Sequence, residues 1–207
     1  MLHKYFSKTY LINLDRREDR LKAAKEECDK IGLTYDRFSA VDGNQLSTKI
    51  SRPTQYWNQG ALGILISNLK IILDAKKNNY ESILILEDDI EFNINTNSIV
   101  ESNFTDIPDD WETIFFGSNN FKKSIPITEN IHKITGAYAL HCYAIKNTIY
   151  DLLIDLLSKP FQPVDVYIAN NIHSRGKSYC FRPPVAYQKE SFSDILNRKV
   201  NYNFLRK

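Results

Sequence analysis

The chain has 207 residues, of which 43% are hydrophobic and 25% are charged, with a formal net charge of +2 at pH 7. This size predicts a single domain over residues 1–207, and the balanced charge excludes the strong positive bias of a dedicated nucleic-acid binder. The three scattered cysteines and the lack of a signal peptide or a transmembrane run predict a cytoplasmic protein without a membrane span.

The first predicted unit is a strand, a tight turn and a helix. Residues 10–14 form a short apolar run, and Asp15 with Glu18 three positions later forms a carboxylate variant of the capping box that opens helices. Apolar residues then recur at helical spacing as far as Ile31, and Gly32 stands where a C-terminal cap belongs.

The next segments repeat the alternation of helix and strand. Residues 34–38 are a candidate strand, followed by an Asp42-Gly43 turn and a polar loop over 44–58. Leucine and isoleucine recur at i, i+3, i+4 and i+7 over 60–77, which predicts a helix. Residues 83–86 are continuously apolar, as a strand covered on both faces of a parallel sheet must be.

The C-terminal half continues the pattern. Strands are expected at 112–116 and 140–145, with a helix over 149–156 before Pro160. The polar and basic stretch 197–207 is expected to be mobile. The order of elements predicts an α/β class with an open, mostly parallel sheet flanked by helices.

Three consecutive carboxylates, Glu87, Asp88 and Asp89, follow the most buried of these strands. Ligands of open α/β sheets bind beyond the carboxyl ends of strands. Adjacent like charges near a core are costly to keep ionised unless a cation compensates them, and oxygen ligands suit Mn²⁺ or Mg²⁺, which favours a diphosphate partner. On spacing alone, a solvated acidic turn accounts for these residues equally well.

The segment from Tyr10 to Leu21 resembles the opening signature of glycosyltransferase family 25, which contains lipooligosaccharide galactosyltransferases and collagen hydroxylysine galactosyltransferases. Later segments resemble the same family in the same order, over nearly the whole chain. They are Phe38–Gly43, Gly60–Lys70, Ile85–Asp89, Pro108–Trp111, Pro163–Asp165, Gln188 and Ser193–Ile195.

The resemblance implies a GT-A type, Rossmann-like fold and inversion at the anomeric carbon of a hexose, galactose or glucose, carried by UDP. It also implies a divalent metal, Mn²⁺ or Mg²⁺, and an acceptor hydroxyl on a glycan, a glycolipid or a hydroxylysine. Two alternatives stay open: a non-catalytic relative that binds nucleotide sugars, and a metal-dependent phosphoryl-transfer or hydrolytic enzyme. The absence of a GxxxxGK[ST] loop weakens the latter.

Positions within these motifs imply roles for individual residues. Asp89 and Asp88 would hold the metal, Asp88 would also contact the donor, and Glu87 would support both. Asp194 would add a metal or diphosphate contact. The expected nucleotide-binding residues are Asn13, Leu14, Arg16, Arg20, Asp42, Asp88 and Gln188. The alternative to a binding role is that Arg16 and Arg20 lie on a surface helix and pair with Glu18 or Asp19.

An inverting transfer needs a carboxylate apart from the metal to deprotonate the acceptor hydroxyl. Asp165, after Pro163-Val164 at a predicted helix start, is the candidate base. Its alternative role is a simple negative charge at a helix N-terminus, and Ser193-Asp194 is likewise a common helix start.

The chain departs from the family pattern in the 60–77 helix. Where the family has Gly-Glu-Ile-Gly-Cys and Ser-His, this sequence has 60–64 as Gly-Ala-Leu-Gly-Ile and 67–68 as Ser-Asn. The missing Glu and His place the usual donor and acceptor contacts of this helix in doubt. His141, in a predicted buried strand, is expected to pack in the core.

Overall fold

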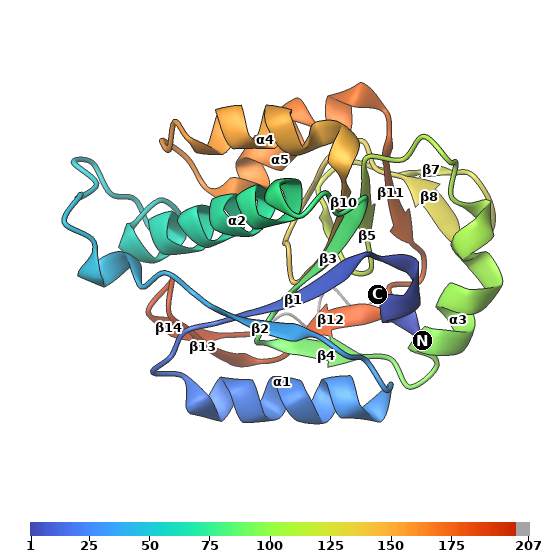
Figure 1. Ribbon diagram of the computed structural model, residues 1–207, viewed down its shortest axis with the longest axis horizontal. Helices are drawn as coiled ribbons and strands as arrows, with labels where there is room; N and C mark the ends of the chain where they lie inside the picture. The colour runs from blue at the N-terminus through green and yellow to red at the C-terminus, as the bar shows by residue number, and fades with distance from the viewer. Residues whose placement is uncertain (202–207) are drawn as a thin grey trace.

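The computed structural model describes residues 1–201 and centres on an eight-stranded sheet in the order β2-β1-β3-β10-β5-β11-β8-β7 (Figure 1). Its strands are β1 (Lys8–Asn13), β2 (Asp36–Ser39), β3 (Ser82–Glu87), β5 (Thr113–Phe115), β7 (Ile125–Pro126), β8 (Ile131–Lys133), β10 (Cys142–Lys146) and β11 (Ser178–Phe181). Within it, only β8 and β10 run against the common direction. The expected α/β class with an open, mostly parallel sheet is confirmed.

Helices cover both faces of this sheet, with α2, α4 and α5 on one side and α1 on the other (Figure 1). The helices are α1 (Glu18–Lys30), α2 (Gln59–Lys77), α3 (Thr96–Asn103), α4 (Tyr150–Leu157) and α5 (Val164–Asn171). Short 3₁₀ turns occupy Leu2–Tyr5, Gly43–Gln45, Phe104–Asp106, Asn147–Ile149 and His173–Arg175.

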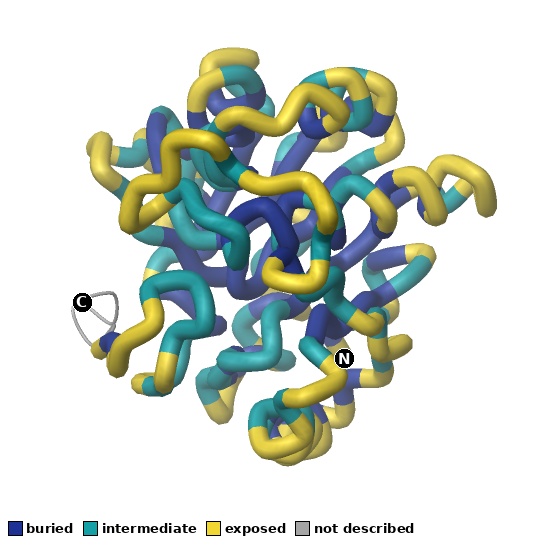
Figure 2. Tube along the Cα trace, turned by 90° about the vertical axis from the view of Figure 1, so that its left-hand side faces the viewer, coloured by how far each residue is buried: buried dark blue, intermediate teal, exposed yellow. Residues whose placement is uncertain are grey.

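Alternate side chains of each central strand fill two separate cores, because successive residues of a strand point to opposite faces. In β1, Leu11 packs on the side of α1, whereas Tyr10 and Ile12 pack on the side of α2. In β3, Leu84 and Ile85 divide in the same way. Figure 2 shows the result, with buried strands inside and exposed loops around them.

Within residues 1–201, three two-stranded ribbons lie outside the main sheet. They are β4 (Ile90–Phe92) with β12 (Ala186–Gln188), β6 (Asn119–Asn120) with β9 (Ala137–Tyr138), and β13 (Ser191–Ser193) with β14 (Arg198–Val200). Because β4 directly follows the acidic residues, its pairing with β12 brings the chain from 186 onward beside them.

Most predicted elements are confirmed, including α2, β3, β5, β10 and α4 within a few residues. The capping-box prediction is wrong: α1 begins at Glu18 with Arg17 as its N-cap, and no side chain caps it. The carboxylate of Asp15 instead accepts hydrogen bonds from Arg37 and Ser39 on the neighbouring β2. The second strand covers Asp36–Ser39 rather than 34–38.

The C-terminal region contains two further differences. No helix starts at Ser193, which ends β13, because the chain turns there into a hairpin with β14. Of the stretch expected to be mobile, 198–200 form β14 and 202–207 lie outside the described residues. Among residues 1–201, none of the helices combines the length and the apolar character that a membrane crossing requires.

Candidate active site

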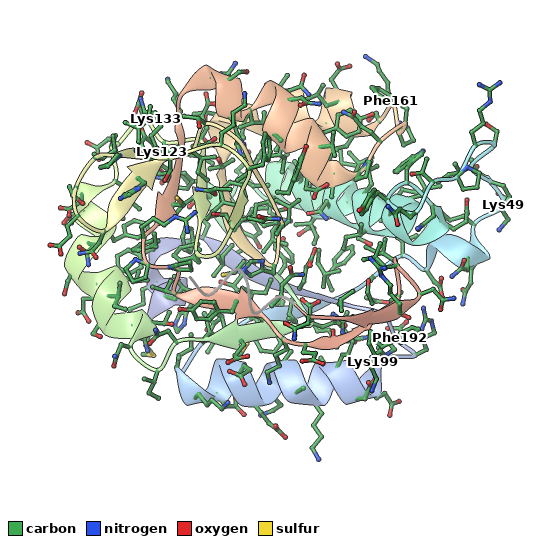
Figure 3. All side chains as sticks on the ribbon, turned by 180° about the vertical axis from the view of Figure 1, so that it is seen from behind. Lys49, Lys123, Lys133, Phe161, Phe192 and Lys199 are labelled. Carbon is green, nitrogen blue, oxygen red and sulfur yellow. The ribbon has the colours of Figure 1, made fainter. Side chains whose placement is uncertain are left out.

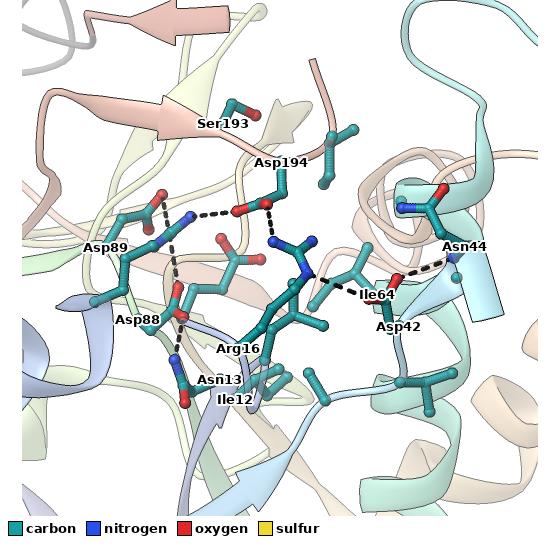
Figure 4. A pocket seen from close by; sticks show the side chains of 18 of the residues that line it. Ile12, Asn13, Arg16, Asp42, Asn44, Ile64, Asp88, Asp89, Ser193 and Asp194 are labelled. Carbon is teal, nitrogen blue, oxygen red and sulfur yellow. Dashed lines mark hydrogen bonds and ion pairs between the residues drawn. The ribbon is translucent and has the colours of Figure 1, made fainter. Parts of the chain in front are cut away.

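A cavity of about 140 Å³ opens beyond the carboxyl ends of β1 and β3 (Figure 4). Its walls come from the β1–α1 connection, the acidic residues after β3, the Asp42 turn, the start of α2 and the segment from Gln188 to Ile195. It brings together Asn13, Leu14, Arg16, Arg20, Asp42, Glu87, Asp88, Asp89, Gln188 and Asp194, which the sequence had singled out separately.

Arg20 bridges two of the acidic residues. Its Nη2 lies 2.6 Å from Oδ1 of Asp88 and 2.9 Å from Oδ2 of Asp89. Oδ2 of Asp88 also accepts a hydrogen bond of 2.7 Å from the side-chain amide of Asn13. The alternative pairing of Arg20 with Glu18 or Asp19 is therefore absent from the described residues. The guanidinium already supplies a positive charge between the neighbouring carboxylates.

Two further arginines hold Asp194, which follows β13. Nη1 of Arg16 lies 2.7 Å from Oδ1 of Asp194, and Arg17 pairs with its other oxygen. Nε of Arg16 lies 3.2 Å from Oδ2 of Asp42, so its side chain, 45% exposed, reaches from one wall of the cavity to another (Figure 4). The sequence predicted no role for Arg17, although it lies between Arg16 and Arg20, for which roles were predicted.

Two glycines allow the Asp42 turn to approach α2. A Cβ on Gly43 would lie 1.6 Å from the carbonyl oxygen of Gln59, and a Cβ on Gly63 would lie 2.4 Å from that of Val41. Larger side chains at either position would therefore push the turn away from the helix.

The first turn of α2 also fixes the segment that carries Asp194. The side chain of Asn58 caps the helix by accepting a hydrogen bond from the backbone N–H of Ala61 at 3.2 Å. Its amide nitrogen donates to the carbonyl oxygen of Ile195 at 2.8 Å. One side chain thus joins the start of the helix to the wall opposite β3.

The acidic residues sit in an environment that opposes ionisation. Burial, reinforced by the charges of Asp89, Asp88 and Asp165, holds the pKa of Glu87 well above its usual range, although Arg20 acts against this shift. Burial raises the pKa of Asp88 to about 6, while Arg20 and the hydrogen bond from Asn13 limit the rise. A cationic ligand would relieve this accumulated negative charge.

Asp89 offers a divalent metal a free carboxylate oxygen in the cavity. Oδ1 of Asp89 is buried and has no hydrogen-bond partner, whereas both oxygens of Asp88 and of Asp194 are already paired. Within residues 1–201, no group of three or more His, Cys, Asp or Glu side chains is arranged to hold a metal. Mg²⁺ commonly binds through one or two carboxylates together with substrate phosphates and water, and Asp89 fits that mode.

Asp165 does not line the cavity. It lies half-buried in the first turn of α5, where its carboxylate accepts hydrogen bonds from the backbone N–H groups of Val166, at 2.9 Å, and Ala139. Burial raises its pKa, and these hydrogen bonds oppose the rise. Asp165 therefore joins the start of α5 to the segment between β9 and β10, close enough to the acidic residues to affect the pKa of Glu87.

The positions that depart from the family pattern lie mostly in the core. Ala61 and Asn68 are 2% and 1% exposed, and Asn68 accepts a hydrogen bond from the buried hydroxyl of Tyr143. Of the substituted positions, Ile64 lines the cavity. His141 is buried as expected, and its carbonyl oxygen accepts a hydrogen bond of 3.0 Å from the backbone N–H of Glu87.

The sequence is similar to those of known proteins. A family model described as glycosyltransferase family 25 (LPS biosynthesis protein) matches residues 6–151. A glycosyltransferase 25 family member of Drosophila melanogaster is 27% identical over 180 residues, which cover 77% of this chain and 29% of that protein. One from Anopheles gambiae is 33% identical over 103 residues, covering 42% and 17%. The chain thus spans less than a third of the length of these relatives.

Solved structures give weaker likenesses. The protein A197 from STIV aligns with a TM-score of 0.48 and 14% identity, covering 88% of this chain and 85% of its own. A glycosyltransferase involved in glycosylation of the major capsid of PBCV-1 aligns with a TM-score of 0.48 and 13% identity, covering 83% and 80%. Neither likeness is close enough to bear on activity.

Proposed function

The chain belongs to glycosyltransferase family 25, and we propose that it is an inverting glycosyltransferase that moves a hexose from UDP to an acceptor hydroxyl with the help of a divalent cation. Galactose and glucose are the candidate sugars, and a glycan, a glycolipid or a hydroxylysine is the candidate acceptor. The curated relatives are much longer than this chain, so its activity stands as a proposal of its own.

The observation that carries the proposal is the arrangement of charges in the cavity. Arg16 and Arg20 line the same space as Asp88, Asp89 and Asp194 at the carboxyl edge of the sheet. Guanidinium groups bind phosphate through paired hydrogen bonds, so a diphosphate can replace carboxylates as their partner. Arg16, the most exposed of these, would release Asp42 and Asp194 when the donor enters.

The cavity of about 140 Å³ is smaller than the ~300–1,000 Å³ usual for ligand pockets, which supports such a rearrangement on binding. Asp89 would hold the cation through its free Oδ1. When bound, the cation would neutralise charge that develops on the departing diphosphate. Asn13 would keep Asp88 oriented through the hydrogen bond that it already donates.

Asp165 is the proposed base. Its carboxylate would take the proton from the acceptor hydroxyl as the acceptor oxygen forms a bond to the anomeric carbon. The bond from that carbon to the diphosphate oxygen breaks, and its electron pair leaves with UDP. A raised pKa suits a base that must accept a proton, and its backbone hydrogen bonds from Val166 and Ala139 hold it in one orientation.

The test is UDP release with Mn²⁺ across a panel of UDP-sugars, alongside calorimetry of UDP with and without Mn²⁺. We expect release from UDP-galactose or UDP-glucose and tighter UDP binding with the metal. If Mn²⁺ leaves UDP affinity unchanged, the metal assignment is wrong. If no UDP-sugar is bound or cleaved, the proposed function is wrong.

Two variants separate the proposed roles. Asp89→Ala should lose the effect of Mn²⁺ on UDP binding, because it removes the free carboxylate oxygen. Asp165→Asn should keep UDP binding and lower transfer by roughly 10²- to 10⁴-fold, as loss of a general base usually does. Full transfer by Asp165→Asn would refute the assignment of the base.

Two observations favour a second candidate, a relative that binds nucleotide sugars without transferring them. Asp165 lies outside the cavity, and Arg20 already neutralises Asp88 and Asp89. Such a protein would bind UDP-sugars with micromolar affinity and release no UDP in any acceptor mixture. Its binding would also be insensitive to Asp165→Asn.

A further inference from the structure

The connection between β5 and β10 returns to the acidic residues. β5 ends at Phe115 and β10 begins at Cys142, and these strands are antiparallel neighbours, so the connection over residues 116–141 begins and ends at the same edge of the sheet and contributes β7 and β8 on the way. The hydrogen bond from the N–H of Glu87 to the carbonyl oxygen of His141 places the end of this connection directly beside the acidic residues.

The β6–β9 ribbon within this connection has one face rich in aromatic side chains. Asn119 is paired with Tyr138, and residues two apart on a strand point to the same side, so Phe121 and Gly136 continue the same face. The ring of Phe121 lies 4.4 Å from that of Tyr138 between centroids and is 48% exposed. None of these four residues carries a charge.

This face also carries polar groups without protein partners. Within residues 1–201, no residue hydrogen-bonds with the side-chain amide of Asn119 or the hydroxyl of Tyr138. An aromatic surface beside a free amide and a free hydroxyl suits a neutral, polyhydroxylated ring, which has apolar C–H faces and hydroxyl edges. Lys122 packs against this face, with its Cδ 3.1 Å from a Cβ placed on Gly136, so a cationic peptide would meet a like charge here.

The ribbon is held in place by specific backbone features. A Cβ on Gly136 would lie 2.7 Å from the ring of Phe121, so only glycine lets this ring rest against the opposite strand. Ala139, next to Tyr138, has a φ of 72°, in the left-handed region that L-residues rarely adopt. Its N–H donates to the carboxylate of Asp165. The aromatic face and the proposed base are therefore joined through adjacent residues.

We propose that Phe121 and Tyr138 form the platform on which a sugar ring of the acceptor stacks, so that its hydroxyl is presented to Asp165. The acceptor is then a glycan, with the amide of Asn119 and the hydroxyl of Tyr138 binding its hydroxyl groups. This inference rests on the proposed function and adds the class of acceptor to it.

The experiment uses the full chain saturated with UDP and the diamagnetic Mg²⁺, with methyl β-galactoside, methyl β-glucoside and lactose as probes. Saturation-transfer NMR should show the strongest transfer to the C–H protons on one face of the sugar ring. Phe121→Ala should weaken binding of the best probe by about 3- to 10-fold, in line with the strength of aromatic contacts. Phe121→Tyr should restore it.

Ile125→Ala is the matched control, because Ile125 is 52% exposed in the same connection but lies outside the platform. In transfer assays, Phe121→Ala should raise the KM for the acceptor, whereas Ile125→Ala should leave it unchanged. Equal sugar binding by the Phe121→Ala and wild-type proteins would overturn the inference, as would binding of a hydroxylysine peptide in preference to all three sugars.

The failure of this inference is distinguishable from failure of the proposed function. If the wild-type protein neither binds UDP nor cleaves UDP-sugars, the proposed function fails whatever the probes do. If it cleaves UDP-sugars but Phe121→Ala changes neither sugar binding nor acceptor KM, only the platform is wrong. Tyr138→Phe keeps the ring and removes the hydroxyl, so it separates stacking from hydrogen bonding.

Discussion

The two sides of the acidic residues are built from different interactions. On the side of the β1–α1 connection, Arg16, Arg17 and Arg20 pair with carboxylates that come from distant parts of the chain. On the side of β6 and β9, the structure rests on strand pairing, ring contacts and hydrogen bonds to backbone N–H groups. An arginine can exchange its carboxylate partner for a phosphate of a ligand, whereas no ligand group replaces the hydrogen bonds between paired strands.

We infer from this contrast that the proposed donor side rearranges on binding, whereas the proposed acceptor side is already formed. Arg16 is 45% exposed, so its ion pairs contribute little net stability and exchanging them on binding costs little. A preformed platform loses less conformational entropy when a flexible glycan binds. Three substitutions and one change of pH test this comparison.

The largest effect is expected from Gly63→Ala on the donor side. Alanine normally stabilises a helix relative to glycine, but here its Cβ would meet the carbonyl oxygen of Val41 at 2.4 Å. We expect the free energy of unfolding to fall by about 2–3 kcal/mol, as overpacking usually causes. Urea denaturation measures it, and Lys70→Ala, at an exposed position of the same helix, is the control. Greater stability would show that the turn can move freely.

The next effect concerns Arg20→Gln, which leaves Asp88 and Asp89 without their shared cation. The three side chains are 11% to 14% exposed, so we expect a loss of roughly 2 kcal/mol, less than for a fully buried pair. Lys25→Gln breaks an ion pair with Asp29 in which both side chains are more than half exposed, and it should cost under about 1 kcal/mol. Equal losses in the two variants would contradict the special position of Arg20.

Protonation of His173 in acid should destabilise the region around β9. Its Nδ1 accepts a hydrogen bond of 3.3 Å from the N–H of Ala137 in β9, and burial lowers its pKa to about 4. Because the folded pKa lies below the unfolded value of 6.5, its contribution is complete above pH 6.5 and is lost as pH falls toward 4.

We therefore expect the stability of the wild-type protein to fall by roughly 1–2 kcal/mol more than that of His173→Gln between pH 7 and pH 4. Thermal unfolding of both proteins across this range measures the difference. Parallel pH profiles would mean that His173 titrates alike in the folded and unfolded chains.

The smallest effect is expected from Ala139→Gly. Glycine adopts a φ of 72° without the steric cost that alanine has there, so stability should rise by about 0.5–1 kcal/mol. Ala137→Gly, two residues earlier in β9, should instead destabilise the protein. A loss of transfer activity in the more stable Ala139→Gly would indicate that the stiff backbone at this position helps to orient Asp165.

Local patterns predicted the elements that support the site. The helical repeat of α2 and the continuous apolar run of β3 are encoded within the segments themselves, so both were found. The position of Asp88 and Asp89 after a buried strand likewise pointed to the cavity. The family motifs added Gln188 and Asp194, which no local pattern would have connected with residues near 88.

Local sequence patterns did not predict the interactions between distant segments of the chain. Asp15 and Glu18 have the spacing of a capping box, but the neighbouring β2 supplies Arg37 and Ser39, which take the carboxylate of Asp15. Alternation of side chains does not encode the direction of a strand, so the antiparallel course of β10 was not foreseen. The backbone partners of Asp165 also depend on the fold of a separate segment.

The antiparallel course of β10 has an evolutionary consequence. Because β5 and β10 are adjacent, the connection between them begins and ends on neighbouring strands of the sheet. Outside β7 and β8, which belong to the sheet, its loops can change by insertion or deletion without altering the register of β1 and β3. The surface beside the acidic residues can therefore diverge among descendants of this chain while the walls formed by β1 and β3 stay the same.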